Sequence, residues 1–422
     1  MKVVHSPSPV SKEASVTQVS EVRVPQVGTP ASMRELNQRI VLTRLRSGGA
    51  ATRPQLAKDT GLSKPTVGQA LLELEQSRLV RTIGRTSAGL GRSAILYESN
   101  PSAGHVMGID IGRARIRVAV ADLAGTVVAR LDEPNRCATA RALVKTVNQL
   151  AHKTVRDAGL DLEDMVAKVV GSPGVPDPRG RILHYAPNLP DWGKKGLLDE
   201  LEAALGVGLV VENDANLAAV GEHARGAAKG VSSFVCVVIG TGIGMGIVLE
   251  GRLYRGAHGA AGEVGYLPYG WNGDENGAAV KKTPSARGLM EAAAAGDSVL
   301  KMAKSENLRD AQSALDVFVM ARNGDARARR IVTEEAARLA YLVASVSAVL
   351  DPELVVLSGG IGKSADLLAG PMDKALRGLT PLVPRIVASE LGEDAVLTGA
   401  ISIGLRSAED IVFDRRNDAI AD

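Results

Sequence analysis

A short pattern of strand, glycine turn and strand occurs twice in this 422-residue chain, and it constrains the fold more than any other feature. The first copy, HVMGIDIGRARIRVAVADLAGTVV, spans residues 105–128, and the second, SFVCVVIGTGIGMGIVLEGRLY, spans residues 233–254. Each turn is tight enough for backbone amides to approach a phosphate. A single glycine turn usually just closes a hairpin, so the evidence lies in the repetition. It predicts two related α/β lobes that face one another across a cleft.

A second segment, which begins at Thr52 and reads TRPQLAKDTGLSKPTVGQALLELEQ, predicts two short helices joined by a tight turn. Thr52 and Gln55 have the spacing of a capping box, so the first helix should run from about Arg53 to Thr60. Gly61 supplies the left-handed residue that ends a helix, and Ser63 is a typical N-cap for the next one. The segment therefore predicts a helix-turn-helix motif.

The second of these helices has an apolar and a polar face. Val67, Leu71 and Leu74 recur at helical spacing and should point inward. The residues expected on the outer face are Lys64, Thr66, Gln69 and Glu73. Because lysine, hydroxyl and amide groups can contact phosphates and base edges, the N-terminal half of this face suits a DNA major groove.

The flanking segments predict a winged helix-turn-helix domain. Apolar positions upstream mark a supporting helix, namely Leu36, Ile40, Val41 and Leu45. LVRTI at 79–83 and AILY at 94–97 predict two strands, and the basic loop GRTSAGLGRS at 84–93 would be the wing between them. The predicted DNA contacts are Ser63, Lys64, Pro65, Thr66 and Gln69 on the second helix, with Arg85 and Arg92 in the wing.

The distribution of charge agrees with DNA binding. Residues 33–97 hold eleven Lys or Arg against four Asp or Glu, a net charge of +7, whereas the whole chain carries only +3. Concentrated positive charge on a small helical module is typical of phosphate-backbone binding. The alternative is a solvated face on a domain that binds another protein.

Composition limits the remaining classes of protein. Aromatic residues make up only 3% of the chain, so aliphatic side chains must dominate the cores. The two cysteines, Cys137 and Cys236, lie far apart, which argues against a disulfide framework and a thiolate metal site. No uncharged apolar run has membrane-spanning length, and residues 1–32 predict a disordered tail without the apolar core of a signal peptide. We therefore expect a cytoplasmic protein with no membrane partner.

Six further motifs identify the family that the chain resembles. They are SPGVPD at 172–177, PNLPDW at 187–192, ENDANLAA at 212–219, IGTGIGMG at 239–246, GAHGAAGEVGY at 256–266 and LSGGIG at 357–362. Together they resemble the ROK family of repressors and sugar kinases, from about residue 33 to 405. The resemblance implies an α/β chain in which the winged helix-turn-helix precedes a two-lobed actin-like (ribonuclease H-like) sugar-kinase fold. The expected domains are 1–32 (tail), 33–100 (winged helix-turn-helix), 101–216 with about 390–408 (first lobe) and 217–389 (second lobe).

The resemblance also assigns candidate ligand residues. In the kinases of this family, the carboxylate at the position of Asp214 accepts the proton of the attacking sugar hydroxyl, while magnesium and the glycine hairpins neutralise the ATP phosphates. Asp214 is thus the candidate general base, although a carboxylate can also hold a sugar hydroxyl without chemistry. The other sugar contacts that the family implies are Gly174, Asn188, Asn213, Glu263 and Tyr266.

The nucleotide-phosphate motifs depart from the family pattern. The first hairpin of active members resembles Asp-x-Gly-Gly-Thr, whereas this chain has Asp110, Gly112, Arg113 and Ala114 at the corresponding positions. Arginine adds bulk beside the γ-phosphate position and alanine cannot donate the lost hydrogen bond, although the guanidinium could itself bind an anion. The other positions expected to face the nucleotide are Gly240, Thr241, Gly242, Gly359 and Gly360. Met245 replaces a usual glycine and should add crowding, so we predict a damaged ATP site.

The zinc region departs as well. Family members follow Gly-Glu-x-Gly-His with a cysteine cluster that holds a structural zinc, but here GEVGY is followed by LPYGWNGDENG without a cysteine. We therefore predict no metal and no resident cofactor, with ATP and magnesium relevant only to a kinase. Tyr266 replaces the histidine, and with Tyr269 and Trp271 it could either contact the ligand or fill the former zinc site as an aromatic cluster. His258 is expected to be a turn or packing residue.

A transcriptional regulator, most simply a repressor, is the function that these features favour. A sugar or sugar phosphate would bind between the lobes, without being phosphorylated, and change operator affinity through lobe closure. Two DNA-binding domains related by a two-fold axis would bind a palindromic double-stranded DNA operator. We therefore expect a homodimer or a homotetramer. The alternatives are an ATP-dependent kinase of a hexose or amino sugar with a fused DNA-binding domain, and a protein whose winged helix docks a protein partner.

Overall fold

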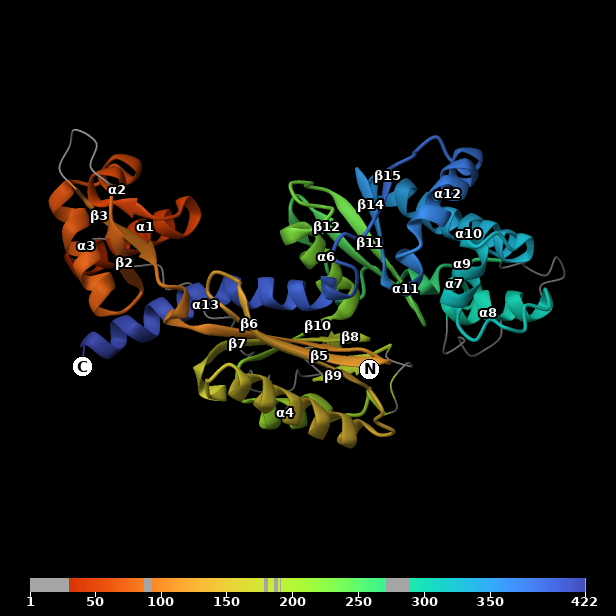
Figure 1. Cartoon of the computed structure of the whole chain (residues 1–422), viewed down its shortest axis with the longest axis horizontal. Coiled ribbons are helices and arrows are strands. Elements are labelled where there is room, and N and C mark those ends of the chain that lie inside the picture. Colours follow the sequence, from red (N-terminus) through yellow and green to blue (C-terminus); the bar gives the residue numbers. More distant parts are fainter. Residues whose placement is uncertain are drawn as a thin grey trace, which may run out of the picture. The chain divides into compact units, whose positions relative to one another are not determined.

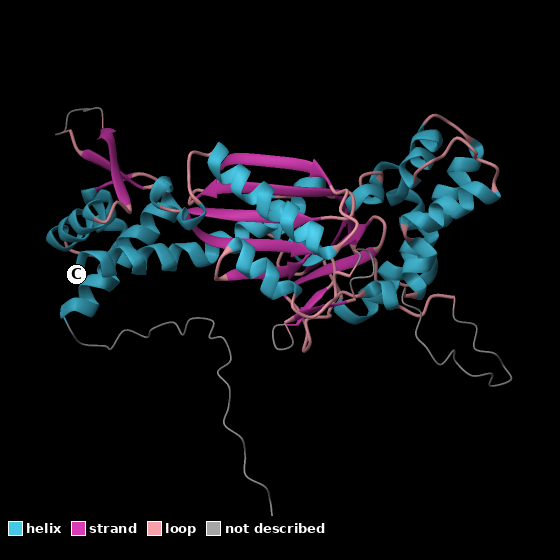
Figure 2. Ribbon diagram, turned by 90° about the horizontal axis from the view of Figure 1, so that it is seen from below, coloured by secondary structure: helices cyan, strands magenta, loops and turns pink. Residues whose placement is uncertain are grey.

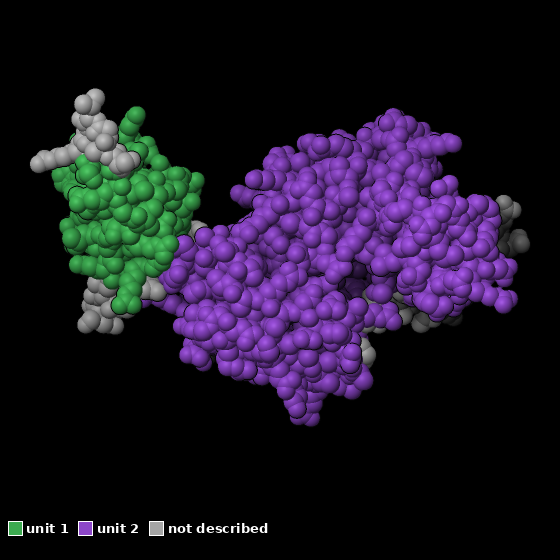
Figure 3. Space-filling view, in the orientation of Figure 1, with its two compact units in different colours: residues 1–100 green, residues 101–422 purple. Residues whose placement is uncertain are grey.

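The chain separates into two compact units, residues 1–100 and 101–422 (Figure 3). The computed structural model describes residues 30–86, 93–177, 181–185, 189, 191–270 and 288–421. The predicted contacts Asn188 and Arg92, and Trp271 with them, lie outside the described residues. No helix within these ranges combines the length and apolar character that a membrane span requires.

Unit 1 is a three-helix domain with a small antiparallel sheet. Its elements are α1 (Pro30–Gly48), β1 (Ala51–Thr52), α2 (Arg53–Thr60), α3 (Lys64–Gln76), β2 (Val80–Arg85) and β3 (Ile95–Ser99), with the strand order β1-β3-β2. The two predicted helices and both predicted strands are confirmed, while the short β1, which pairs with β3, was not foreseen.

The turn between α2 and α3 forms as its residues dictate. The side-chain oxygen of Gln55 accepts hydrogen bonds from the amide and the hydroxyl of Thr52, at 2.8 and 2.9 Å. Gly61 ends α2 with φ at 73°, in the left-handed region where residues with a Cβ are disfavoured. Ser63 then caps α3 by accepting a hydrogen bond from the Thr66 amide at 3.2 Å. Local capping therefore fixes both helix ends.

The core of unit 1 is aliphatic. Val67, Leu71 and Leu74 of α3 are buried, as predicted. They pack with α1 and α2, whose fully or almost fully buried residues are Val41, Leu42, Leu45 and Leu56. The supporting helix marked by Leu36, Ile40, Val41 and Leu45 is confirmed as α1, although 44% of the surface of Leu36 is exposed.

Unit 2 contains two five-stranded sheets with the same order of strand types (Figure 1). The first has the order β10-β7-β4-β5-β6, and the second has the order β13-β12-β11-β14-β15. In each sheet, the two strands of the glycine hairpin and the strand after them form an antiparallel meander, β4-β5-β6 or β11-β12-β13. Two further strands pair in parallel on the other side of the first hairpin strand, namely β7 and β10 beside β4, and β14 and β15 beside β11. The repeated hairpin in the sequence therefore reflects a repeated sheet, as the α/β fold class predicted.

The first sheet lies between helices on both faces. Its strands are β4 (His105–Ile111), β5 (Arg115–Asp122), β6 (Val127–Pro134), β7 (Met165–Ser172) and β10 (Leu209–Asn213). One face packs on α4 (Ala140–Asp157) and α5 (Leu197–Leu205), and the other packs on α13 (Ala395–Ala421), which Figure 1 shows running along the sheet. Short elements nearby are η1 (Pro101–Ala103), η2 (Leu162–Asp164), and the paired strands β8 (Val175–Asp177) and β9 (Ile182–His184).

The second sheet carries most of the remaining helices on one side (Figure 2). Its strands are β11 (Phe234–Ile239), β12 (Ile243–Leu249), β13 (Arg252–Leu253), β14 (Leu354–Ser358) and β15 (Arg385–Ala388). The helices between and after these strands in the chain are η3 (Val264–Tyr266), α7 (Leu289–Ala294), α8 (Gly296–Ser305), α9 (Ala314–Arg322), α10 (Ala326–Leu350), α11 (Gly359–Gly362), α12 (Ala365–Leu379) and η4 (Gly392–Asp394). Helix α6 (Asp214–Arg225) packs on β11 and β12 and also on α13, so it joins the two halves of the unit.

Candidate functional site

The start of α3 presents the predicted DNA-binding residues at the surface of unit 1. Ser63, Lys64, Pro65 and Gln69 are exposed and Thr66 is half-buried. The hydroxyls of Ser63 and Thr66 share a hydrogen bond of 2.8 Å, and the Gln69 amide donates to Glu73 at 2.7 Å. Arg85 is exposed at the end of β2, where the chain leaves the sheet. The helix start thus offers a lysine and polar side chains to a partner.

Glu73 departs from its expected place on the free outer face. Its carboxylate accepts a hydrogen bond from the side chain of Gln38 on α1 as well as the one from Gln69. The residue is half-buried and belongs to the α1–α3 contact. The exposed, basic part of α3 is therefore confined to its N-terminal half.

In unit 2, the junction of β10 and α6 brings several predicted ligand residues together. Asn213 is the N-cap of α6, and its side-chain oxygen accepts from the Asn216 amide at 3.1 Å. Its side-chain nitrogen donates to the carbonyl of Gly174 at 3.1 Å. Gly174 has φ at 92°, a left-handed conformation that suits glycine. The two segments ENDAN and SPGVPD are thereby held against each other.

Asp214 is the first residue of α6, and it lies near two further carboxyl groups. Its Oδ1 accepts from the Ala215 amide at 2.8 Å. Burial, followed by the charge of Asp110, raises the pKa of Asp214 to about 7, and Glu263 contributes in the same direction. Burial and the charge of Glu291 likewise raise the pKa of Glu263 to about 7. Strand β4, helix α6 and the segment before η3 therefore place three carboxyl groups in one region.

An ion pair between a buried carboxylate and an exposed arginine, which the sequence did not suggest, holds this region together. Glu212 is only 5% exposed, and its carboxylate accepts from the Arg255 guanidinium at 2.7 Å. It also accepts from the side chain of Asn216 and the amide of Asn213, both at 2.9 Å. Since Arg255 precedes the GAHGAAGEVGY segment, the pair fixes that segment beside α6. In the sequence, the only hint of this ion pair is Glu212, the acidic residue that begins ENDAN.

The two glycine turns have the expected geometry. The Gly112 amide donates to the Arg115 carbonyl at 2.9 Å, and the Gly240 amide donates to the Gly242 carbonyl at 2.9 Å. Arg113 and Ala114 are exposed at the tip of the first turn, and Thr241 is exposed in the second.

The third glycine segment lies against the second hairpin. Gly359 has φ at 80°, and a Cβ there would lie 2.5 Å from the Ile239 carbonyl oxygen, so only glycine allows α11 to approach β11 this closely. Gly360 follows as the second residue of α11.

Met245 does not crowd the second hairpin, so that prediction was wrong. Its side chain is 4% exposed and lies in the aliphatic core with Ile243 and Ile247. The period of two along β12 explains this, because residues 243, 245 and 247 share the face that packs on the helices. Gly244 and Gly246 on the other face approach α6.

The two described members of the predicted aromatic cluster, Tyr266 and Tyr269, contact different partners. Tyr266 is 42% exposed and meets Tyr185 edge to face, with ring centroids 5.7 Å apart. Tyr269 instead packs against Tyr341, at 5.1 Å, beside the core of the second half. Tyr266 therefore stays available as a ligand contact, and His258 is exposed in a turn. The described residues contain no group of three or more His, Cys, Asp or Glu placed to hold a metal ion, and the loss of zinc stays a prediction.

Asp110 forms a second unforeseen ion pair. Its Oδ2 lies 3.0 Å from Nη1 of Arg117, and the two residues are 5% and 9% exposed. Burial raises the pKa of Asp110 to about 6, and the neighbouring guanidinium opposes that rise. Arg117 also contacts Asp132 and Glu393.

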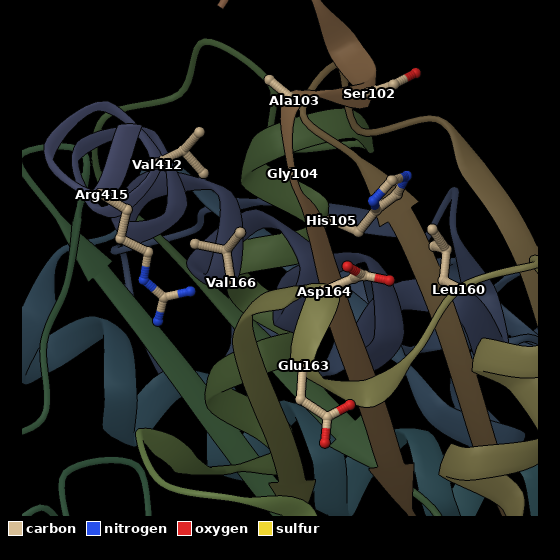
Figure 4. Close-up of a pocket in the computed structure, with 10 residues that line it drawn as sticks. All are labelled: Ser102, Ala103, Gly104, His105, Leu160, Glu163, Asp164, Val166, Val412 and Arg415. Carbon is tan, nitrogen blue, oxygen red and sulfur yellow. The ribbon is translucent and has the colours of Figure 1, made fainter. Parts of the chain in front are cut away.

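A pocket of about 250 Å³ lies elsewhere in unit 2, between the start of β4, η2 and the end of α13 (Figure 4). Ala103, Val166 and Val412 give it apolar walls, and His105 and Arg415 also line it. Burial lowers the pKa of His105, and the charges of Asp122 and Asp164 oppose this effect. None of the predicted site residues lines this pocket.

The model of the ROK family matches residues 106–406. A glucokinase from Thermotoga maritima is 30% identical over 321 residues, which cover 71% of this chain and 96% of the glucokinase. A xylose repressor from Bacillus subtilis is 26% identical over 377 residues, which cover 88% of this chain and 95% of the repressor.

A crystal structure of a ROK family transcriptional regulator matches with a TM-score of 0.70 and 20% identity. The match covers 91% of this chain and 98% of that regulator. At this identity the likeness shows a shared fold across both units.

Proposed function

The chain belongs to the ROK family, and on this premise we propose that it is a sequence-specific DNA-binding transcriptional regulator whose unit 2 binds a sugar or sugar phosphate as effector without phosphorylating it. The family includes both repressors and glucokinases among the relatives of this chain. The proposal therefore depends on what distinguishes the two classes.

The observation that carries the proposal is the difference in coverage. The glucokinase is matched over 96% of its length but leaves 29% of this chain unmatched, whereas the xylose repressor matches 88% of the chain. A sugar kinase has no use for a helix-turn-helix unit with a net charge of +7 over residues 33–97. The exposed start of α3, with Ser63 and Lys64, suits contacts to DNA phosphates and base edges.

The residues of unit 2 support ligand binding more than phosphoryl transfer. Asp214, Asn213 and Glu263 lie together and offer hydrogen-bonding groups to sugar hydroxyls. The first hairpin does not fit a magnesium-bound nucleotide, because Arg113 and Ala114 form its tip and the Asp110 carboxylate is paired with Arg117. Sugar binding would then act through closure of the two halves of unit 2. A homodimer or homotetramer would present two DNA-binding domains to a palindromic operator.

Selection of DNA fragments followed by binding measurements tests the proposal. The full chain is used to enrich sites from random duplexes, and the affinity for the selected site is measured by fluorescence anisotropy with and without sugars and sugar phosphates. We expect a palindromic site and at least one sugar that changes its affinity five-fold or more, a typical allosteric coupling. Failure to enrich any site would contradict the proposal.

A sugar kinase is the second candidate, because glucokinases are among the relatives and the pKa of Asp214 at about 7 suits a general base. An assay of ADP release over hexoses and amino sugars separates the two. Turnover that disappears in Asp214→Asn would favour the kinase, whereas sugar binding without turnover favours the regulator.

A further inference from the structure

The carboxylate of Asp110 and the guanidinium of Arg117 face each other across neighbouring strands. Asp110 on β4 pairs directly with Arg117 on β5 in the antiparallel register, so their side chains leave the same face of the sheet. Oδ2 and Nη1 are 3.0 Å apart, and both residues are more than nine-tenths buried. The pair is thus a formed, largely dry contact at the end of the first hairpin strand.

Arg117 is held in place from three directions. Besides Asp110, its Nε donates to Asp132 of β6 at 3.3 Å and its Nη2 donates to Glu393 of η4. Asp132 is itself fixed by Arg115. A rotation of Arg117 away from Asp110 would leave a buried carboxylate without its cation, which is costly. The guanidinium therefore stays beside Asp110 in the folded unit.

The same network reaches the second half of unit 2. Glu393 also accepts from Lys363, the residue that directly follows the glycine segment of α11. Asp110, Arg117, Glu393 and Lys363 thus form one chain of alternating charges. It runs from the first glycine hairpin to the third glycine segment, and both segments belong to the nucleotide motifs of the sequence.

We propose that Arg117 is a built-in cation that pairs with the carboxylate through which the first hairpin would engage a metal-bound nucleotide. The predicted cleft of unit 2 would then be a receptor that needs neither magnesium nor ATP. A guanidinium is always charged and donates several hydrogen bonds, so it neutralises Asp110, and its bond to Oδ2 competes with a divalent ion for that oxygen. The ion pairs of Glu393 with Arg117 and with Lys363 then connect the two halves of unit 2 through protein groups alone. The inference deepens the proposed function and rests on it only in treating the predicted cleft as a receptor.

Binding of Mn²⁺ to the full chain tests the inference without DNA or sugar. Electron paramagnetic resonance is used to titrate Mn²⁺ into the wild type, Asp110→Asn, Arg117→Gln, Arg117→Lys and the double variant Asp110→Asn/Arg117→Gln. We expect the wild type and Asp110→Asn to bind Mn²⁺ equally weakly. Arg117→Gln should gain at least ten-fold in affinity, Arg117→Lys should gain little, and the double variant should lose the gain.

Two outcomes would overturn the inference. One is Mn²⁺ binding by the wild type that Asp110→Asn weakens ten-fold or more, because the carboxylate would then be free for a metal. The other is a folded Arg117→Gln, judged by circular dichroism and thermal unfolding, with no gain in affinity. If Arg117→Gln does not fold, the comparison of wild type with Asp110→Asn decides alone.

A second measurement separates this inference from the proposed function. The operator affinity of the wild type and its response to sugar are compared with and without magnesium and the non-hydrolysable analogue AMP-PNP. Equal responses support the inference, and a change of five-fold or more contradicts it. Absence of any operator would defeat the proposed function but leave the Mn²⁺ result standing.

Discussion

Glu335 lies on the buried face of α10 with no exposed surface. Neither of its carboxylate oxygens has a hydrogen-bond partner among the described residues. Burial raises the pKa of this carboxyl well above its ordinary value of 4.5, and the nearby Arg338 offsets only part of the effect. The folded state therefore favours the neutral acid, whereas the unfolded chain ionises above pH 4.5.

We predict that Glu335→Gln flattens the pH dependence of stability. Because the folded pKa is raised, the stabilising contribution of the acid is present at low pH and is lost as pH rises above 4.5, by about 1.4 kcal/mol per pH unit until the folded pKa is reached. The variant should match the wild type near pH 5 and exceed it in free energy of unfolding at pH 8. Denaturant unfolding across this range is the measurement. Glu200→Gln, at an exposed position of α5, is the control, and parallel curves for Glu335→Gln and wild type would contradict the prediction.

Asp214 should make sugar binding depend on pH. With its pKa at about 7, a ligand that needs the ionised carboxylate to accept a hydroxyl hydrogen bond must bind more tightly as pH rises towards 8. Asp214→Asn should lose about 10- to 100-fold in affinity, the value of one charge-assisted hydrogen bond, together with the pH slope. Calorimetry from pH 5.5 to 8.5 in two buffers measures both, since binding below pH 7 should release a proton.

Glu263→Gln is the matched variant for this experiment. It removes one of the charges that raise the pKa of Asp214, so the midpoint of the pH dependence should move to lower pH while the slope remains. A pH-independent affinity in the wild type would show that the ionised Asp214 is not the form that binds.

The sequence could not reveal the ion pairs that organise these residues. Asp214, Asn213 and Gly174 belong to short motifs whose resemblance to a family was readable. Arg117 and Glu393, however, are separated by 276 positions, and no local pattern marks a contact of that range. Glu212 and Arg255 likewise meet only because β10 and the segment after β13 fold side by side.

At the scale of elements, the parts governed by local forces were the most predictable. The boundaries of α2 follow from the interaction of Gln55 with Thr52 and from the left-handed Gly61, all within ten residues. Apolar periodicity also marks α10, Ala326–Leu350, whose buried residues Leu339, Val343 and Val346 recur at helical spacing. In contrast, the exposure of Leu36, the core position of Met245 and the contact of Tyr269 with Tyr341 depend on which neighbouring element packs there. Periodicity gives the face of a helix or strand but not what covers it.

Helix α3 provides the test at this scale. Lys64 is exposed in its first turn, so Lys64→Ala should leave thermal unfolding unchanged. If Lys64 contacts one DNA phosphate, the variant should weaken operator binding several-fold and reduce the slope of log affinity against log salt by about 0.9. Anisotropy titrations between about 50 and 200 mM salt measure the slope.

Lys145→Ala is the matched control for Lys64→Ala. Lys145 is exposed on α4 of unit 2, so its removal takes away the same charge outside the helix-turn-helix unit. Equal losses of affinity in the two variants would mean that net charge, and not the start of α3, determines operator binding.

At the scale of the whole molecule, unit 2 contains the same sheet architecture twice. The related glucokinase covers 71% of this chain and so has no counterpart of the rest. The two sheets are connected by α6, by Glu212 with Arg255, and by the network of Arg117, Glu393 and Lys363. Each connection lies at an end of the sheets where ligand motifs occur. A ligand that contacts both halves could therefore change their arrangement, and through it the affinity of unit 1 for DNA, only in proportion to its preference for one arrangement.

The last prediction is that this coupling is reciprocal. If an effector sugar changes operator affinity by a given factor, saturating operator DNA must change sugar affinity by the same factor, because both are binding equilibria of one thermodynamic cycle. Calorimetric titration of the sugar with and without operator duplex gives one factor, and anisotropy with and without sugar gives the other. At a sugar concentration that saturates the wild type, Asp214→Asn should show little response of operator affinity, while it keeps the operator affinity of the sugar-free wild type. Unequal factors would mean that the sugar acts through a change in oligomeric state or a second site, and a normal response in Asp214→Asn would exclude the region around α6 as the effector site.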